Sequence, residues 1–197
     1  MTKRLFDIAF SFFGLIIASP ILLLVTLLIK IDSKGPIFYR GKRAGKDGKE
    51  FRIFKFRTMA PDAEKLGGPS TAADDPRLTN FGKFLRKRKL DELPQLINVL
   101  LGQMSIVGPR PEVPSEVETY DSKTKEIILS AKPGMTDLAS LANLHEEEIL
   151  KGSKNPHQTY QELIKPQKLR LAVEYVKNRS FWFDIKIIFK TIKSVFF

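Results

Sequence analysis

Two adjacent carboxylates, Asp91 and Glu92, follow a strongly basic stretch of the chain. A run of charges usually marks only the solvated face of a helix, and an aspartate beside it is most often a helix cap. A carboxylate pair next to clustered cations could also serve at a site that attracts a phosphorylated substrate. Five cations occupy seven positions just upstream of the pair: Lys83, Arg86, Lys87, Arg88 and Lys89.

The position of Asp91 can be estimated from the apolar pattern that follows it. Pro94 is tolerated only in the first turn of a helix, where its missing N–H has no intrahelical partner anyway. The helix is therefore expected to begin at about Leu90 or Asp91, with Asp91 at or beside its N-cap. The helix dipole there, together with Arg86 and Arg88, should favour the ionised carboxylate. The apolar stripe of this helix consists of Leu93, Leu96, Ile97, Leu100 and Leu101.

Three further cations stand where a phosphate contact is chemically reasonable. Arg110 lies between two prolines, so its backbone has little freedom and its guanidinium could grip a phosphate with two parallel hydrogen bonds. The alternative is a merely stiff loop. Lys55 and Arg57 share one face of a predicted strand in Phe51–Met59. That face is either solvated or in contact with phosphate, and the pattern alone favours neither.

Composition limits both the chemistry and the partners. The 197 residues suit one domain, and 43% of them are apolar, which argues against general disorder. The chain has no cysteine and only two histidines, which excludes disulfides, thiolate nucleophiles, cysteine-based zinc sites and histidine-rich metal sites. The net charge of +11 implies an anionic partner: nucleic acid, a lipid surface or a phosphorylated substrate.

The segment from Ile8 to Ile29 carries no charge and would form a helix about 33 Å long, close to the thickness of a bilayer core. A signal peptide would be shorter, and a core helix would be apolar on one face only, so membrane insertion is favoured. Both flanks are positive, which a single crossing cannot reconcile with the positive-inside rule. Pro20 bends a helix, and Ser19 can satisfy part of the freed backbone. We therefore expect a re-entrant helix, with a spanning helix that tolerates its proline as the alternative.

The remaining pattern predicts an α+β fold: a small β-hairpin or sheet, several helices and amphipathic interfacial helices. Residues 36–59 are predicted as a hairpin with a turn at Gly45–Gly48, and residues 60–77 as a loop. The segment 180–197 is amphipathic, which suits either a core helix or an interfacial membrane helix. Other helices are expected at residues 79–89, 115–130, 146–151 and 165–177, and a turn at Lys132–Thr136.

The order of these motifs along the chain resembles that of the bacterial sugar transferases known as monotopic phosphoglycosyl transferases. The resemblance covers nearly the whole of this chain and concerns the catalytic core of that family. The resemblance implies a re-entrant membrane helix-hairpin at 1–34 and a catalytic domain at 35–197, which includes the amphipathic helix 180–197. It also implies a place on the cytoplasmic face of the bacterial inner membrane. The blocks that carry it are Lys3–Asp7, Ser19-Pro20, Gly35–Phe38, Phe54–Met59, Leu90–Gln95, Met104–Pro111, Lys132–Thr136 and Tyr175–Asn178.

The reaction implied by this resemblance moves a sugar 1-phosphate from a UDP-sugar to polyprenyl (undecaprenyl) phosphate, with release of UMP, and begins surface glycan assembly. Asp91 matches the family's nucleophile, which forms a covalent phosphosugar intermediate, and Glu92 matches the second carboxylate. Mg²⁺ is implied as the cofactor, with both carboxylates as candidate ligands. The residues matched or proposed for phosphate binding are Arg86 and Arg110 and, as weaker candidates, Lys55 and Arg57.

Two departures from the family pattern concern specificity. Many relatives carry Gly and then Trp-Ala-Gln-Val-Asn-Gly after Pro-Gly-Ile-Thr, whereas this chain continues from Thr136 with Asp137 to Ser140 and reaches an acidic cluster at Glu146–Glu148. Ala172 stands where some relatives have an aspartate. The sugar, the pathway and the oligomeric state are left open.

Three other functions account for less of the sequence. A non-enzymatic basic protein at a membrane surface explains the charge and the apolar segments, but gives no reason for the carboxylate pair. A nucleic-acid binder does not explain the N-terminal segment, so no nucleic acid is expected as a partner. An ordinary glycosyltransferase would release UDP in place of UMP.

Overall fold

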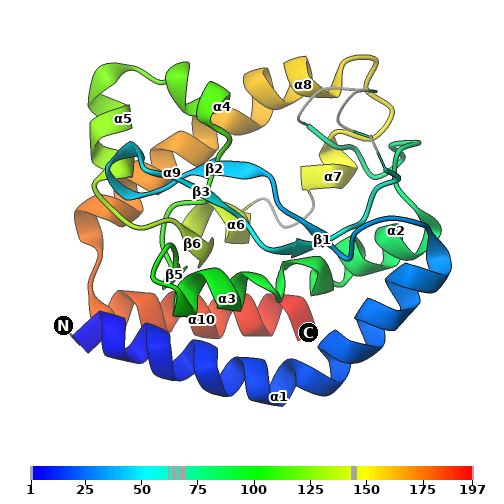
Figure 1. Cartoon of the computed structure of the whole chain (residues 1–197). Helices are drawn as coiled ribbons and strands as arrows, with labels where there is room; N and C mark the ends of the chain where they lie inside the picture. Colours follow the sequence, from blue (N-terminus) through cyan, green and yellow to red (C-terminus); the bar gives the residue numbers. More distant parts are fainter. Residues whose placement is uncertain (1, 62, 64–65, 67–69, 143–145, 197) are drawn as a thin grey trace.

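The protein is a mixed fold of helices and short strands, shown in Figure 1 as a computed structural model, and the predicted α+β class is confirmed. The structure describes residues 2–61, 63, 66, 70–142 and 146–196. The α-helices of this part are α1 (Thr2–Asp32), α2 (Asn80–Lys87), α3 (Gln95–Leu100), α4 (Pro114–Glu118), α5 (Ser122–Leu129), α6 (Leu138–Ala142), α7 (Glu146–Ile149), α8 (Pro156–Thr159), α9 (Lys165–Asn178) and α10 (Phe181–Phe196). The strands are β1 (Phe38–Tyr39), β2 (Lys42–Ala44), β3 (Glu50–Arg52), β4 (Lys55–Phe56), β5 (Ser105–Val107) and β6 (Gly134–Thr136).

Two antiparallel pairs form the predicted hairpin over residues 36–59. Strand β1 pairs with β4, with Phe38 opposite Phe56, and β2 pairs with β3. The turn expected at Gly45–Gly48 is a short 3₁₀ turn, η1 (Lys46–Gly48), with φ values of 57° at Asp47 and 74° at Gly48. Glycine and aspartate tolerate this left-handed region better than most residues, which is why the sequence marks the turn correctly.

The third pair, β5 with β6, is parallel and was not predicted. Ser105 lies opposite Gly134, where the sequence predicted only a turn. That prediction was wrong because the strand obtains its backbone partners from a segment about 30 residues away, which no local pattern reports. A Cβ on Gly134 would lie 2.0 Å from the backbone nitrogen of Gly108, so the two segments approach more closely than any side chain allows. This contact fixes the start of the loop Pro109–Glu112.

The helices expected at 79–89, 146–151, 165–177 and 180–197 correspond to α2, α7, α9 and α10. The helix expected over 115–130 is instead two helices, because Asp121 accepts a hydrogen bond from the Thr124 N–H (3.0 Å) and starts α5 anew. A short π-helical turn, η4 (Tyr160–Ile164), joins α8 to α9. The loop predicted at 60–77 lies partly outside the described residues, and its two ends are joined by a bridge between Met59 and Leu78.

The main core lies where β3, α3, β5, α9 and α10 meet. A second cluster joins the end of α1 to α2 and β4 through Val25, Ile29, Phe56 and Leu85. The buried residues of the main core are Phe51, Ile53, Leu96, Val99, Met104, Ile106, Val107, Tyr175, Ile187 and Ile188.

Helix α1 is held to the rest of the chain at both ends. Near its start, Arg4 donates hydrogen bonds to the last carbonyls of α3, at Val99 (2.6 Å) and Leu100 (2.9 Å). The buried carboxylate of Asp7 accepts hydrogen bonds from Ser105 Oγ (3.1 Å) and the Ile106 N–H (3.0 Å) on β5. Its other end packs into the second cluster. Both ends therefore contact the same folded body.

Between these ends α1 changes direction, as Figure 1 shows. Pro20 lacks the N–H that would bond the Ile16 carbonyl, and the hydroxyl of Ser19 donates to that carbonyl at 2.7 Å. The hydroxyl thus supplies a hydrogen bond to the carbonyl that Pro20 leaves without its usual helical donor. The most apolar 18-residue window of α1 has a mean hydropathy of 2.7 and only 11% of it is buried, so the helix is long and apolar enough to cross a membrane.

The apolar side chains of α1 and α10 form a large exposed surface. Figure 1 shows both helices along the lower edge of the molecule, and the rings of Phe6 and Phe181 join them at 5.5 Å. α10 turns Ile187 and Ile188 into the core while Trp182 remains 78% exposed. This division fits the expected amphipathic helix. The exposed large apolar side chains of the two helices are Leu5, Ile8, Phe10, Phe12, Phe13, Ile16, Ile17, Ile21, Leu23, Leu24, Leu27, Ile31, Trp182, Phe189 and Ile192.

Candidate active site

The carboxylate pair lies on a tight turn between α2 and α3. The 3₁₀ turn η3 (Leu90–Glu92) follows α2, and α3 begins only at Gln95, with Pro94 as its N-cap residue. The α-helix start expected at residue 90 or 91 is therefore wrong by about one turn. Because Pro94 has no N–H to bond the Leu90 carbonyl, that carbonyl accepts from the Leu93 N–H (3.3 Å) and closes a tighter turn.

Glu92 is clamped by two cations from other parts of the chain. Its Oε1 accepts a hydrogen bond from Lys55 Nζ on β4 at 2.7 Å and another from Arg110 Nη2 at 2.7 Å. Burial alone would raise the pKa of Glu92, but the charges of Arg110 and Lys55 outweigh it and hold that pKa well below its usual range. Glu92 is therefore ionised and fixed in place.

Asp91 meets the opposite surroundings. Its side chain is buried, and no residue that the structure describes donates a hydrogen bond to its carboxylate. Burial, together with the negative charge of Glu92, raises the pKa of Asp91 to about 6, although Lys55 and Arg86 act against this. The expectation that its surroundings favour the ionised form is thus wrong in direction, because burial outweighs the nearby cations. At neutral pH the carboxylate is still mostly ionised.

The two cations of the clamp respond to the same burial. Burial lowers the pKa of Lys55, and the charge of Arg110 adds to this, while Glu92 and Asp91 oppose it. The carboxylate of Glu92 raises the pKa of Arg110 above its ordinary value. Three segments distant in the chain, β4, η3 and the loop after β5, thus bring the carboxylate pair and two cations to one place.

Arg86 lies on α2 and turns toward α7. Its Nε and Nη2 atoms both approach Glu147 Oε1, at 2.9 Å each. Arg86 is still near enough to Asp91 for its positive charge to lower that pKa. Of the predicted phosphate-binding residues, Arg86 therefore faces a carboxylate of the acidic cluster that the sequence singled out.

Arg57 is engaged elsewhere. Its guanidinium donates to the backbone carbonyls of Ser33 (2.8 Å), Lys34 (2.8 Å) and Pro36 (2.7 Å), and the residue is buried. These bonds join the end of α1 to β4, which is a structural task. They do not bring Arg57 to the carboxylate pair, and the phosphate contact predicted for it stays a prediction.

A second charged group lies behind the loop Pro109–Glu112 and was missed by the sequence analysis. Lys168 on α9 approaches Glu112 Oε1 at 3.5 Å, Glu146 Oε2 at 3.2 Å and the hydroxyl of Tyr160 at 3.3 Å. Beside it, Lys165 donates to Glu116 Oε2 at 2.9 Å. The partners lie 8 to 56 residues apart along the chain, so no local signal could have joined them.

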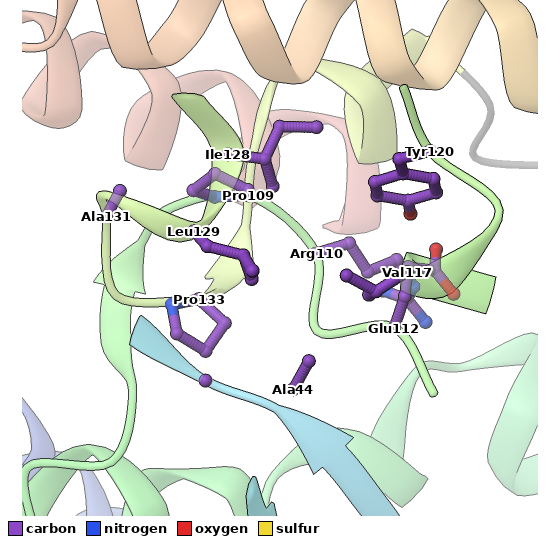
Figure 2. A pocket seen from close by; sticks show the side chains of 11 residues that line it. Ala44, Pro109, Arg110, Glu112, Val117, Tyr120, Ile128, Leu129, Ala131 and Pro133 are labelled. Atoms are coloured by element: carbon purple, nitrogen blue, oxygen red, sulfur yellow. The ribbon is translucent and has the colours of Figure 1, made fainter. Parts of the chain in front are cut away.

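Arg110 also lines a cavity of about 280 Å³ between this loop and the helices α4 and α5. Figure 2 shows the hydroxyl of Tyr120, the carboxylate of Glu112 and the guanidinium of Arg110 gathered on one side of it. Apolar side chains line the other side. A second cavity of about 320 Å³ shares these three residues and reaches α9. Arg110 thus stands between the carboxylate pair and a hollow region of the protein.

The donor set fits a magnesium ion that arrives with a substrate. Within the described residues, no group of three or more His, Cys, Asp or Glu could hold a metal. Asp91 and Glu92 nevertheless supply two carboxylates, and Mg²⁺ at phosphoryl-transfer sites needs one or two beside the phosphate oxygens. The cations Lys55 and Arg110 already bound to Glu92 make a preformed metal cage unfavourable here.

The chain belongs to the bacterial sugar transferase family, whose model matches it over residues 1–197. It is 40% identical over 192 residues to the UDP-glucose:undecaprenyl-phosphate glucose-1-phosphate transferase of Klebsiella pneumoniae, covering 96% of this chain and 39% of that protein. It is 38% identical to the undecaprenyl-phosphate galactose phosphotransferase of Salmonella typhimurium, covering 98% of this chain and 40% of that one.

A shorter relative matches along most of its own length. The exopolysaccharide production protein ExoY of Sinorhizobium fredii is 36% identical over 210 residues, covering 99% of this chain and 85% of ExoY. The chain therefore spans about two fifths of the two glycosyl-phosphate transferases and most of ExoY. Relatives named as transferases favour an enzyme over the non-enzymatic membrane-surface protein.

Proposed function

We propose that this chain is a phosphoglycosyl transferase, which moves a sugar 1-phosphate from a UDP-sugar to polyprenyl phosphate and releases UMP. The observation that carries the proposal is the contrast between two neighbouring carboxylates. Glu92 is bound by Lys55 and Arg110, whereas Asp91 has no hydrogen-bond donor among the described residues. A nucleophile needs a free lone pair beside the charges that hold its target.

In the first step, a carboxylate oxygen of Asp91 attacks the β-phosphorus of the UDP-sugar. The bond from this phosphorus to the bridging oxygen breaks, UMP leaves with the electron pair, and the sugar phosphate stays on Asp91 as an acyl phosphate. An ionised carboxylate has no proton to lose, so this step needs no general base. Lys55 and Arg110 offset the negative charge of the diphosphate, which is the main requirement of phosphoryl transfer.

In the second step, an oxygen of polyprenyl phosphate attacks the same phosphorus. The acyl phosphate bond breaks and the carboxylate of Asp91 is restored. The acceptor is a lipid, so it must reach the site from a bilayer. The exposed apolar surface of α1 and α10 supports a reaction at the membrane surface.

Mg²⁺ is the proposed cofactor, and Asp91 and Glu92 are the residues that would hold it beside the diphosphate. When bound, it supplies charge neutralisation at the phosphates. The protein's own residues hold and orient the diphosphate from the other side, since Arg110 presents a planar fork that can bond two phosphate oxygens at once.

The proposed location is the cytoplasmic face of the bacterial inner membrane, with α1 entering and leaving the bilayer on one side. Two observations support this. Both ends of α1 contact the same folded body, and Lys3 and Arg4 at one end match Lys30 and Lys34 at the other in charge. UDP-sugars are cytoplasmic substrates by this proposal, and the product would begin the assembly of a surface glycan.

The test is to incubate the detergent-solubilised protein with a UDP-sugar in the absence of polyprenyl phosphate. The intact mass should rise by one phosphosugar, and UMP should appear in a burst of about one per active enzyme, as two-step covalent catalysis requires. Polyprenyl phosphate should then remove the adduct. Asp91→Asn keeps the shape of the side chain but should lose the adduct and lower turnover by roughly 10³-fold or more.

Asp121→Asn is the matched control, because it makes the same change at an exposed carboxylate that caps α5. Its rate and its adduct should equal those of the unmodified protein. Full turnover in Asp91→Asn would contradict the assigned nucleophile. UMP release that requires the acceptor, with no adduct at any time, would favour direct transfer between the two substrates.

A further inference from the structure

One buried carboxylate oxygen has no use in the proposed reaction. Asp137 is only 1% exposed, and its Oδ1 accepts a hydrogen bond from the Ser140 N–H at 2.6 Å. Its Oδ2 is buried and has no hydrogen-bond partner among the described residues. Leaving a buried acceptor without a hydrogen bond destabilises the fold, and such groups are rare in native proteins. A partner brought in from outside the chain would remove this cost.

The surroundings of Asp137 offer room for such a partner. The residue lines the 320 Å³ cavity between the loop Pro109–Glu112 and α9. Small side chains at Ala139 and Ala172 leave this space next to the carboxylate. The cavity is partly open to solvent, so a ligand could enter it from outside the chain.

The cavity begins where the diphosphate would be held. Arg110 binds Glu92 through Nη2 at 2.7 Å, and the same side chain lines the cavity. In Figure 2 its guanidinium lies beside the hydroxyl of Tyr120 and the carboxylate of Glu112. The sugar of a UDP-sugar is bonded directly to the phosphate that Asp91 would attack. The sugar therefore needs a pocket beside Arg110, and this cavity adjoins Arg110.

The lining has the chemistry that a polyhydroxylated ring requires. Lys168 is already paired with Glu112 and Glu146, so it leaves Oδ2 of Asp137 available as an acceptor. Burial raises the pKa of Tyr120 and of Tyr160, which keeps both hydroxyls protonated and able to donate. Burial likewise raises the pKa of Asp137, in keeping with a carboxylate whose charge no hydrogen bond at Oδ2 stabilises.

We propose that this cavity receives the sugar of the UDP-sugar, and that Oδ2 of Asp137 accepts a hydrogen bond from one ring hydroxyl. Asp137 is then a specificity-determining residue, and it lies in the segment where the sequence departs from its family pattern. The inference rests on the proposed function, because it takes a UDP-sugar to be the substrate. An analogue without that hydroxyl would leave Oδ2 buried and unpaired, so the site would discriminate strongly between the complete sugar and the analogue.

The experiment measures UMP release with the UDP-hexose that the unmodified protein uses best, and with analogues of it that each lack one ring hydroxyl. Asp137→Asn is the chosen variant. Because Oδ1 must accept from the Ser140 N–H, the amide places its nitrogen where Oδ2 was, and an acceptor becomes a donor. We expect kcat/KM for the complete sugar to fall about 10- to 100-fold. For one deoxy analogue, the variant and the unmodified protein should differ by less than about threefold, because the interaction is already lost.

Two measurements guard this result. UMP, which lacks the sugar, should bind to Asp137→Asn with unchanged affinity. Glu116→Gln is the matched control: this buried carboxylate is partnered by Lys165 and Gln161 and should leave the pattern among deoxy sugars unchanged, whatever its effect on thermal stability.

The outcomes separate this inference from the proposed function. If Asp137→Asn lowers the rate by the same factor for every analogue, or weakens UMP binding as much as UDP-sugar binding, the cavity does not hold the sugar through Asp137. If the unmodified protein releases no UMP from any UDP-sugar, the proposed function fails and the inference falls with it. An Asp137→Asn protein that does not fold would be replaced by Asp137→Ser, which keeps a capping oxygen, in the same comparison.

Discussion

Asp91 and Glu92 are neighbours in the chain, yet their carboxylates meet opposite surroundings. Glu92 accepts hydrogen bonds from Lys55 and Arg110, and its pKa lies well below the usual range. Asp91 has no such donor among the described residues, and burial raises its pKa to about 6. Pairs of groups whose pKa values are driven apart are typical of sites that divide chemical tasks. In the proposed reaction the division is between Glu92, a fixed and charged anchor, and Asp91, a nucleophile without a hydrogen-bond donor.

Asp91→Asn is expected to stabilise the fold at pH 8 but not at pH 3. The pKa of Asp91 is about 6 in the folded state against an ordinary value of 3.8. Between these values the folded state binds more protons than the unfolded chain, so the free energy of unfolding falls as pH rises through this window. Asparagine has no proton to lose. The gain at pH 8 is up to about 3 kcal/mol, measured by unfolding in detergent. A variant no more stable than the original protein at pH 8 would contradict the raised pKa.

At the residue scale, the sequence could name candidates but not their partners. Lys55, Arg110 and the carboxylate pair were all marked by charge and by proline, and the structure brings them together. Arg57 looked equivalent to Lys55, because alternation along a strand says nothing of which carbonyls a guanidinium will meet. Asp137 gave no signal of its own, since burial and an unpaired oxygen exist only in the folded chain.

At the element scale, the sequence predicts the elements that depend on neighbouring residues, but not those that depend on contacts between distant segments. Helix period, caps and turn residues located most helices and the hairpin, because each depends on neighbours within about four residues. The parallel pair of β5 and β6 depends on a contact between Gly108 and Gly134. It positions the loop that carries Arg110, since the Gly134 N–H donates to the Pro109 carbonyl at 2.9 Å. The strand pair that positions Arg110 is therefore the element that the sequence did not predict.

Gly134→Ala should damage this element and the reaction together. The new Cβ would lie 2.0 Å from the Gly108 nitrogen, so the two segments must separate. We expect a loss of about 1–3 kcal/mol or more in the free energy of unfolding, and a fall in UMP release as Arg110 moves. Gly152→Ala is the control: its Cβ meets no atom within 4 Å, so it measures only the cost of alanine at a left-handed φ of 72° and should leave UMP release unchanged. A Gly134→Ala protein as stable and active as the control would contradict this account.

At the scale of the whole molecule, charge and apolar surface divide the tasks. The net charge of +11 would attract both anionic substrates of the proposed reaction and an anionic lipid surface. The apolar surface of α1 and α10 lies along one edge of the molecule (Figure 1). Since the carboxylate pair follows α2, which packs on α1, only one helix separates the site from the apolar helix α1. This arrangement suits a reaction between a water-soluble and a lipid substrate.

The topology of α1 follows from its attachments. The N-terminal part is tied to α3 and β5 by Arg4 and Asp7, and the C-terminal part to α2 and β4 by Val25 and Ile29. A helix that crossed the bilayer would have to break one of these two sets of contacts, because its ends would lie on opposite sides. With the bend at Pro20, both sets of contacts would persist in the proposed re-entrant arrangement, in which the middle of the helix enters the lipid.

Single cysteines at Thr2, Ser33 and Ser122 should therefore all react from the same side of the membrane. The chain has no cysteine of its own, so each label reports one position, and none of the three changes removes a charge from the flanks. Ser122 is exposed on α5 and reports the side of the catalytic domain. In inverted and right-side-out vesicles, an impermeant thiol reagent should label all three only from the cytoplasmic side. Labelling of Thr2→Cys from the opposite side to Ser122→Cys would establish a spanning helix, and it would require the contacts of Arg4 and Asp7 with α3 and β5 to be absent in the membrane.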